Sequence, residues 1–127
     1  MEKAEVAQWL DRYVAAWKSY DRDQIVGLFA ERAVYRYRPD DEPIVGSSAI
    51  ADDWIGDPDD PGSYDASYQP VAVDGDTAVV TGSSTYTDPD GSLRTIFDNC
   101  FVIRFDSEGR CTEFTEWFME RPAPAGA

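Results

Sequence analysis

The second half of the sequence has the pattern of four long β-strands separated by three tight turns. We expect these strands at residues 64–73, 77–87, 93–105 and 111–120. Asp74-Gly75 is a strong hairpin signal, and residues 88–91 (Asp-Pro-Asp-Gly) are typical of a type I turn closed by a glycine bulge. Residues 106–109 turn the chain back once more. Because strands joined by short turns pair antiparallel and long strands coil, the pattern predicts a curved antiparallel meander.

The N-terminal residues have the spacing of an amphipathic helix. Apolar side chains recur at three- and four-residue steps at Val6, Trp9, Leu10, Tyr13, Val14 and Trp17. This spacing predicts a helix over residues 3–19 with a single apolar stripe.

Three shorter elements should separate this helix from the meander. Asp21 is a candidate N-cap for a second helix, which would carry Ile25, Val26, Leu28 and Phe29. Residues 33–38 alternate in the manner of a strand. Ser47 or Ser48 is expected to cap a third helix, which would hold Ile50, Trp54 and Ile55.

These elements predict one α+β domain. A chain of 127 residues, of which 43% are apolar, is long enough for a single core. Three N-terminal helices packed on one face of a curved, mainly antiparallel sheet would enclose a cavity. We expect an ordered core of about residues 4–120 and a frayed tail over residues 122–127.

Charge and composition exclude several classes of function. The net charge of -14 repels phosphate backbones and anionic membranes, so we expect no nucleic-acid partner; the acidity favours solubility or the steering of a cationic ligand. No apolar run is long enough to span a bilayer, and without a secretory signal the expected location is the cytoplasm. Histidine is absent, so chemistry must use carboxylates, phenols, amides or arginine. The acidic segment 52–60 lacks calcium-loop spacing and is interpreted as a solvated loop, and we expect neither a metal nor a cofactor.

Strand pairing can be predicted from the turns. If Asp88 pairs with Ser92 and Phe105 pairs with Arg110, alternation divides the side chains between two faces. One face then collects Thr81, Ser83, Phe97, Asn99, Phe101, Phe114, Glu116 and Phe118. The other collects Asp98, Cys100, Val102, Glu113, Thr115 and Trp117. The four phenylalanines indicate that the first face is the concave one, covered by helices. In this register Cys100 is opposite Thr115 and Cys111 is opposite Arg104, too far apart for a disulfide, so two free thiols are predicted.

Several segments together resemble a known family. They are residues 12–17, residues 21–30, residues 46–50 followed by Trp54, residues 102–105, the Gly109-Arg110 turn and residues 113–117. Over about residues 4–120 the chain is similar to the SnoaL-like domain of the NTF2-like superfamily. The resemblance implies a cone-shaped fold around one apolar pocket. Because isomerases, cyclases, epoxide hydrolases, dehydratases and non-catalytic binders share this fold, it does not imply one reaction.

The resemblance also permits a residue-by-residue test. The oxyanion tyrosine of ketosteroid isomerases corresponds to Tyr13, but their general-base aspartate corresponds to Tyr37 and their second oxyanion acid to Phe101. That mechanism is therefore absent, and no Arg-Asp-Asp arrangement typical of limonene epoxide hydrolases is found. SnoaL-type polyketide cyclases use a carboxylate deep in the sheet, and here the candidate is Glu116.

Three residues are candidates for catalysis. Glu116 in an apolar cavity would suit general acid–base chemistry, or it pairs with Arg94 or Arg104, or it points outward. Asn99 would orient Glu116 or bind a carbonyl, or it is a satisfied buried amide. Tyr13 would donate to an oxyanion, or it belongs only to the core stripe. The expected substrate-binding residues are Trp17, Tyr35, Tyr37, Trp54, Thr81, Ser83, Phe97, Phe101, Phe114 and Phe118.

The sequence thus leaves several functions open. The first is an isomerase- or cyclase-type enzyme that uses carboxylate acid–base chemistry on a small apolar carbonyl compound. The alternatives are a non-catalytic ligand-binding or scaffold domain and an epoxide hydrolase-like enzyme. Trp117 and Val102 on the outer face indicate a partner surface, and the resemblance implies a homodimer there.

Overall fold

Residues 1–122 form three helices and one six-stranded sheet. A computed structural model describes residues 1–122, so the predicted fraying of the tail beyond residue 122 lies outside the described residues. The elements are α1 (Lys3–Ser19), α2 (Arg22–Leu28), β1 (Phe29–Arg36), β2 (Ile44–Val45), α3 (Ser47–Gly56), β3 (Tyr64–Asp74), β4 (Thr77–Thr87), β5 (Leu93–Phe105) and β6 (Cys111–Glu120). The strand order is β2-β1-β6-β5-β4-β3, and every pairing is antiparallel except that of β1 with β6.

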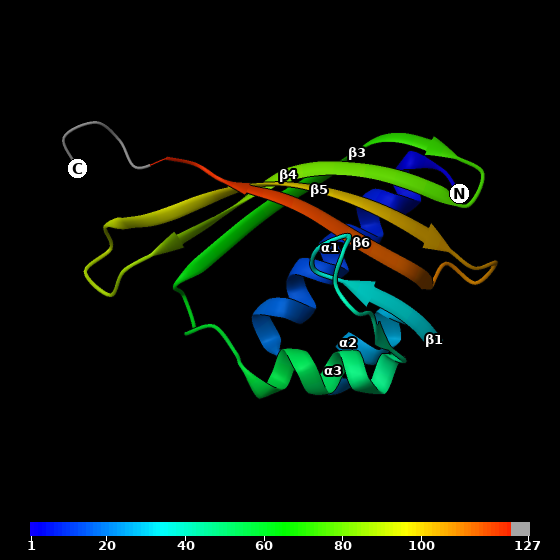
Figure 1. The fold of residues 1–127 in the computed structure, drawn as a ribbon, viewed down its shortest axis with the longest axis horizontal. Coiled ribbons are helices and arrows are strands. Elements are labelled where there is room, and N and C mark those ends of the chain that lie inside the picture. Colours follow the sequence, from blue (N-terminus) through cyan, green and yellow to red (C-terminus); the bar gives the residue numbers. More distant parts are fainter. Residues whose placement is uncertain (123–127) are drawn as a thin grey trace.

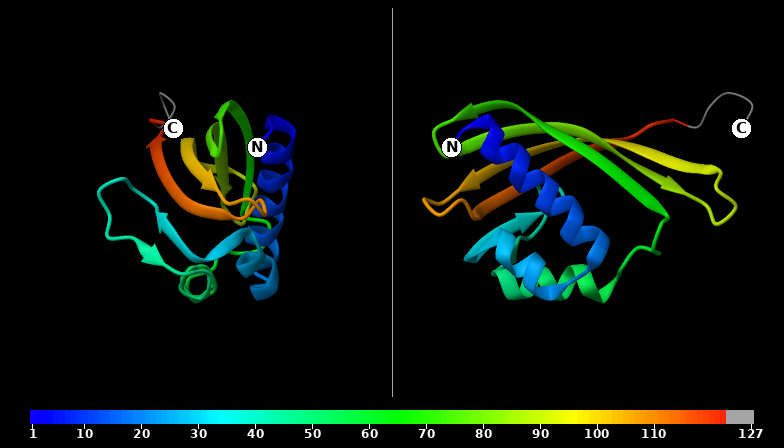
Figure 2. Two further views of the ribbon diagram at one scale, coloured as in Figure 1. Left: turned by 90° about the vertical axis from the view of Figure 1, so that its right-hand side faces the viewer. Right: turned by 180° about the vertical axis from the view of Figure 1, so that it is seen from behind.

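The helices lie on one side of a strongly curved sheet. The long strands β3 to β6 arch across the top of Figure 1, while α2 and α3 lie below them. Figure 2 shows α1 running diagonally across the inner side of the arch, beside β3. The predicted α+β architecture is confirmed. No helix among the described residues is long and apolar enough to cross a membrane.

The ends of α1 follow from local chemistry. Glu2 and Glu5 form a reciprocal capping box at its start, so backbone N–H groups that lack helical partners are satisfied. The helix ends at Tyr20, whose φ of 50° is left-handed and whose N–H donates to the Ala16 carbonyl. This reversal turns the chain into α2, where the side chain of Asp21 accepts from the Gln24 N–H, as predicted.

Two boundaries differ from the sequence predictions. Phe29 does not belong to α2; it is extended and begins β1, where it pairs with Cys111 and packs its buried ring edge-on against Trp9. Tertiary packing here overrides the helical periodicity. The expected serine cap of α3 was also wrong, because Gly46 is the N-cap, with a φ of 101° and no side-chain cap.

A bulge changes the predicted register between β4 and β5. The predicted turn is present: Asp88 N–H donates to Ser92 O at 2.9 Å and Gly91 has a φ of 85°. The register shifts by one residue between Thr87 and Tyr86, and every pair farther from the turn keeps this shift. The assignment of Thr81 and Ser83 to the concave face is therefore wrong. They pair with Cys100 and Asp98 of the outer face, and Gly82 and Ser84 take the concave positions.

The register between β5 and β6 differs from the predicted one by two residues, but this shift does not change the face on which each side chain lies. Phe101 pairs with Glu116 and Asn99 with Phe118, two positions away from the predicted partners. An even shift keeps each side chain on its predicted face. Cys100 therefore lies opposite Trp117 and Cys111 opposite Phe105, and the predicted free thiols are confirmed.

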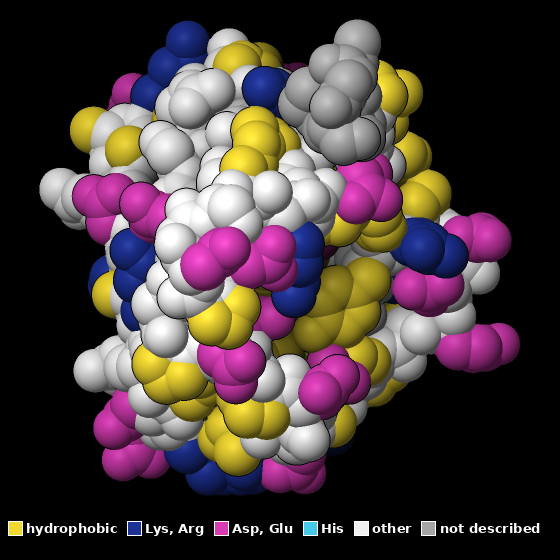
Figure 3. Space-filling view, turned by 90° about the vertical axis from the view of Figure 1, so that its left-hand side faces the viewer, with side chains coloured by type: hydrophobic (Ala, Val, Ile, Leu, Met, Phe, Trp, Pro, Cys, Tyr) yellow, Lys and Arg dark blue, Asp and Glu magenta, His cyan; other side chains and the backbone are white. Residues whose placement is uncertain are grey.

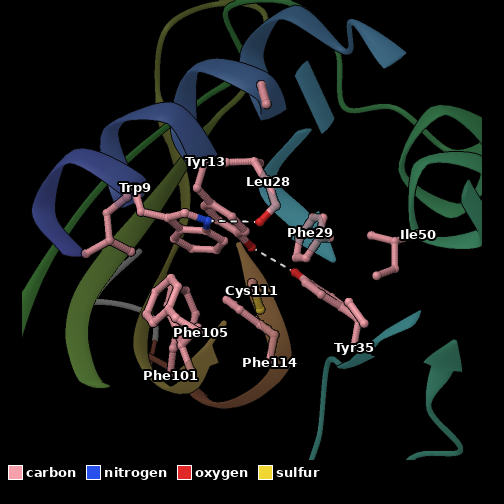
Figure 4. Packing of buried hydrophobic residues seen from close by; sticks show 14 of the residues in the cluster. Trp9, Tyr13, Leu28, Phe29, Tyr35, Ile50, Phe101, Phe105, Cys111 and Phe114 are labelled. Carbon is pink, nitrogen blue, oxygen red and sulfur yellow. Dashed lines mark hydrogen bonds between the residues drawn. The ribbon is translucent and has the colours of Figure 1, made fainter. Parts of the chain in front are cut away.

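Aromatic rings fill the closed end of the arch. Figure 4 shows the rings of Trp9, Tyr13, Tyr35 and Phe114 gathered between the helices and the sheet. Tyr13 stacks on both Trp9 and Phe114, with ring centroids 5.4 and 5.5 Å away, and Tyr35 stacks on Phe114 at 4.5 Å. The buried indole N–H of Trp9 donates to the Leu28 carbonyl at 3.0 Å, which ties α1 to α2.

Gly82 tests how tightly β3 and β4 are packed. A Cβ at Gly82 would lie 2.1 Å from Ser67 O and 2.5 Å from the Tyr68 ring. Gly82→Ala should therefore lower the free energy of unfolding by about 1–3 kcal/mol, because the two strands must move apart. Gly27→Ala is the control, since nothing lies within 4 Å of that site and alanine favours a helix. Urea unfolding that gives both variants equal stability would contradict this packing.

Candidate functional site

A cavity of about 410 Å³ opens at the end of the arch opposite the aromatic core. Figure 3 looks at this end and shows a hollow with a hydrophobic interior and acidic side chains around it. Its lining comes from α1, α3, the strands and the segment after α3: Tyr13, Trp17, Tyr20, Tyr35, Tyr37, Asp53, Trp54, Asp57, Asp59, Tyr68, Ser84, Tyr86, Phe97, Asn99, Glu116 and Phe118.

Most of the predicted site residues face this cavity. Those that do are Tyr13, Trp17, Tyr35, Tyr37, Trp54, Phe97, Asn99, Glu116 and Phe118. Phe101 and Phe114 lie on the same face of the sheet but are fully buried in the core, and they do not line the cavity. Thr81 and Ser83 lie on the outer face, as the register shift requires.

Other lining residues were missed by sequence reasoning. The bulge moves Ser84 and Tyr86 to concave positions that line the cavity. These two residues could have been predicted only if the bulge itself had been predicted. Asp57 and Asp59 belong to a segment interpreted as an ordinary solvated loop. Tyr20 and Tyr68 carried no separate signal in the sequence.

Glu116 lies half-buried in the cavity, without a basic partner. Its Oε2 accepts a hydrogen bond from Asn99 Nδ2 at 2.6 Å, and none of the ion pairs among residues 1–122 involves it. Burial raises the pKa of its carboxyl group to about 7, although the Asn99 hydrogen bond acts in the opposite direction. The group can therefore both accept and release a proton near neutral pH.

The two arginines that might have neutralised Glu116 lie elsewhere. The Arg94 guanidinium stands over the Tyr86 ring, 5.5 Å from its centroid. Arg104 lies opposite Glu113 in the strand register, on the outer face of β5 and β6. Neither alternative proposed for Glu116, pairing with arginine or pointing outward, occurs.

Asn99 is held in one orientation by Ser84. The Ser84 hydroxyl donates to Asn99 Oδ1 at 3.1 Å, which leaves the amide nitrogen to donate to Glu116. Both Ser84 and Asn99 are buried, so the bond between them is shielded from solvent, whereas the bond to half-buried Glu116 lies at the cavity. It joins β4, β5 and β6 at one level of the concave face.

Tyr13 and Tyr35 form the boundary between the core and the cavity. Their hydroxyl groups lie 2.8 Å apart, joined by the dashed line in Figure 4, and either can be the donor. Burial raises the pKa of both phenols well above its ordinary value, so both stay protonated. Tyr13 is thus a core residue and a lining residue at once.

Carboxylates stand at the rim of the cavity. Tyr37 donates to Asp53 at 2.7 Å, and Trp17 Nε1 donates to Asp59 at 3.2 Å. No lysine or arginine is found among the described residues that line the cavity. Among residues 1–122 there is also no group of three or more Asp, Glu or Cys side chains arranged to hold a metal ion.

A second, more open hollow reaches the same carboxylate from the edge of β6. Its volume is about 590 Å³, and it shares Asn99, Glu116 and Phe118 with the main cavity. The Arg38 guanidinium lies over the Phe118 ring, 5.3 Å from its centroid, and Arg38 also lines this hollow. Glu116 therefore lies where two openings meet.

Comparison with solved structures identifies the fold. An NTF-2 like protein of unknown function from Burkholderia xenovorans LB400 aligns with a TM-score of 0.71 and 14% identity, over 99% of this chain and 91% of the other. An LEH-like epoxide hydrolase of M. tuberculosis aligns with a TM-score of 0.67 and 20% identity, over 94% of this chain and 86% of the other. At such identities the likeness shows the fold alone.

Comparison of sequences identifies the family. No curated protein matches the chain significantly. The family model of the SnoaL-like domain, however, matches residues 10–114, which include the C-terminal part of α1, all of α2 and α3, and most of the sheet. Because this match extends over most of the chain, the protein belongs to the SnoaL-like domain family.

Proposed function

We propose that the cavity binds a small, largely apolar carbonyl compound and that Glu116 transfers a proton within it. The observation that carries this proposal is the carboxylate itself: it faces an aromatic cavity, it accepts from an amide, and it forms no ion pair among residues 1–122. A carboxyl group with a pKa of about 7 is matched to acid–base work near neutral pH.

The proposed chemistry needs no group beyond this chain and its substrate. Ionised Glu116 removes a proton from the carbon next to the substrate carbonyl, and the electron pair of the C–H bond moves to the oxygen. The Tyr13 hydroxyl donates to that oxygen, while Asn99 holds the carboxyl group in place. Protonated Glu116 then returns the proton to a different carbon, which gives an isomerase. If the enolate carbon instead attacks a second carbonyl carbon of the substrate, the electron pair of that C=O bond moves to its oxygen, the oxygen takes the proton from Glu116, and the reaction is a cyclisation.

Two other functions predict different behaviour. A non-catalytic binding domain would hold the same ligand without proton exchange, so deuterium from solvent would not enter the ligand. An epoxide hydrolase-like reaction would consume water and an epoxide. It is less well supported, because no arginine among residues 1–122 forms an ion pair with Glu116.

The first test replaces the proposed base. Glu116→Gln should lower kcat by about 100-fold or more, because general-base catalysis typically contributes this much, while substrate binding changes little. Glu113→Gln is the matched control on the same strand, since Glu113 lies on the outer face opposite Arg104. Measured kcat and binding constants on an identified carbonyl substrate decide the matter; a Glu116→Gln variant with normal turnover would refute the assignment.

The second test uses stability and needs no substrate. Because the pKa of Glu116 rises from 4.5 to about 7 on folding, the folded chain loses stability as pH rises through this window. Gln is always neutral, so the stability of Glu116→Gln relative to the native protein should increase between pH 4.5 and 7, by on the order of 3 kcal/mol. Urea unfolding at both pH values measures the difference. An unchanging difference would contradict the burial of the ionised group.

We also propose that the outer face of the sheet forms a homodimer. Trp117 is 45% exposed and Met119 is 77% exposed on this face, close to half-buried Val102 and Cys100. Trp117→Glu should then shift the protein to a monomer in analytical ultracentrifugation, because a charge cannot be buried in an apolar contact. Val45→Glu, at an exposed position on β2, is the control. A monomeric native protein would rule out the dimer.

A further inference from the structure

The charges that line the main cavity are of one sign. Four carboxylates face it, those of Asp53, Asp57, Asp59 and Glu116, and no lysine or arginine is among its described lining residues. The low-dielectric aromatic walls strengthen the field of these groups inside the cavity. An anionic ligand such as a phosphate ester or a carboxylate is disfavoured there, whereas a cation is attracted.

Two arginines stand over rings of the lining, Arg94 over Tyr86 and Arg38 over Phe118, but neither forms an ion pair with a carboxylate of the cavity. Lys18 pairs with Asp65 and Arg22 pairs with Asp52, both outside the cavity lining. Among the ion pairs formed within residues 1–122, none includes a carboxylate of the cavity. The negative charge of the lining therefore remains available to a ligand.

Asp59 is held in the wall and differs from the solvated acids around it. Its Oδ2 accepts from Trp17 Nε1 at 3.2 Å and from the Tyr20 hydroxyl at 3.4 Å, while its N–H donates to Tyr20 at 2.9 Å. Trp17 and Tyr20 come from the end of α1, so these contacts fix the segment after α3 against that helix. Asp59 is half-buried, whereas Asp53 and Asp57 are exposed at the rim.

Aromatic rings surround this carboxylate. Trp17 lies 6.3 Å from Tyr86 between ring centroids, and Tyr86 meets Phe97 at 5.8 Å in an edge-on contact. All three rings line the cavity. Several aromatic faces with a carboxylate beside them form the chemical environment that recognises ammonium groups, since each ring face carries a negative quadrupole.

We propose that the ligand of this cavity is an amine-bearing compound, bound as its cation, with the ammonium group between Asp59, the Trp17 ring and the face of the Tyr86 ring that Arg94 does not cover, and with its apolar body directed toward Glu116. The inference rests on the proposed use of this cavity as the substrate site and adds the class of substrate. Asp59 supplies charge, the rings supply cation–π contacts, and Glu116 and Asn99 remain the reacting end.

A matched pair of ligands tests the charge separately from the shape. Benzyltrimethylammonium and its uncharged isostere neopentylbenzene have nearly the same volume, and benzenesulfonate is the anionic comparison. Binding is measured from the ¹H–¹⁵N signal of the Trp17 indole, which reports on the cavity directly. The cation should bind about tenfold more tightly than the isostere, and benzenesulfonate should not bind.

Asp59→Asn keeps the hydrogen-bond acceptor and removes the charge. In this variant the advantage of the cation over the isostere should fall about tenfold, while the affinity of the isostere stays the same. Asp52→Asn, whose charge pairs with Arg22 outside the cavity, should leave the advantage unchanged.

The outcomes separate this inference from the proposed reaction. If the isostere binds as tightly as the cation, or if Asp59→Asn leaves the preference intact, the inference is overturned while proton transfer by Glu116 still stands. If neither compound perturbs the Trp17 signal, the inference and the use of the cavity as a ligand site both fail. A charge preference that Asp59→Asn removes supports the inference, whatever the kinetics of Glu116→Gln.

Discussion

The hydrogen bond from the Asn99 amide to the Glu116 carboxylate sets the character of the cavity. A carboxylate among aromatic rings needs a hydrogen-bond donor, because a buried charge without a partner destabilises the fold far more than a partnered one. Asn99 supplies one donor at 2.6 Å without adding a compensating charge, and Ser84 fixes the amide in the orientation that allows it. The carboxyl group is thereby held in position yet left able to exchange a proton.

The rest of the fold brings this group to the boundary of the packed core. Along β5 and β6 the concave face is apolar up to Phe101 and Phe114, and it becomes polar at Asn99 and Glu116. Tyr13 and Tyr35 close the core at that level by bonding to each other. Beyond them the strands curve away from α1 and α3, and the space between is the cavity. The packed core therefore ends, and the cavity begins, at this level of the sheet.

Sequence patterns predicted the elements better than the contacts between them. Turn signals and long alternating runs placed β4, β5 and β6 at their observed ends, because these signals are local. The face of a strand depends instead on the parity of its register, which a single bulge reverses. The bulge beside Tyr86 exchanged Ser83 for Ser84, whereas the even shift between β5 and β6 left Glu116 on its predicted face. Asp59 was not predicted, because its position depends on a contact with α1 that is distant in sequence.

The pKa of the Glu116 carboxyl group, measured by ¹³C NMR titration with Glu116→Gln to assign the signal, tests the central claim most directly. We expect the titration midpoint of the Glu116 carboxyl group at a pH of about 7. In Asn99→Leu the midpoint should rise further, because the amide hydrogen bond favours the ionised form and lowers the pKa. A midpoint near the ordinary 4.5 in the native protein would mean that water reaches the group freely, and the account of a desolvated proton-transfer site would be wrong.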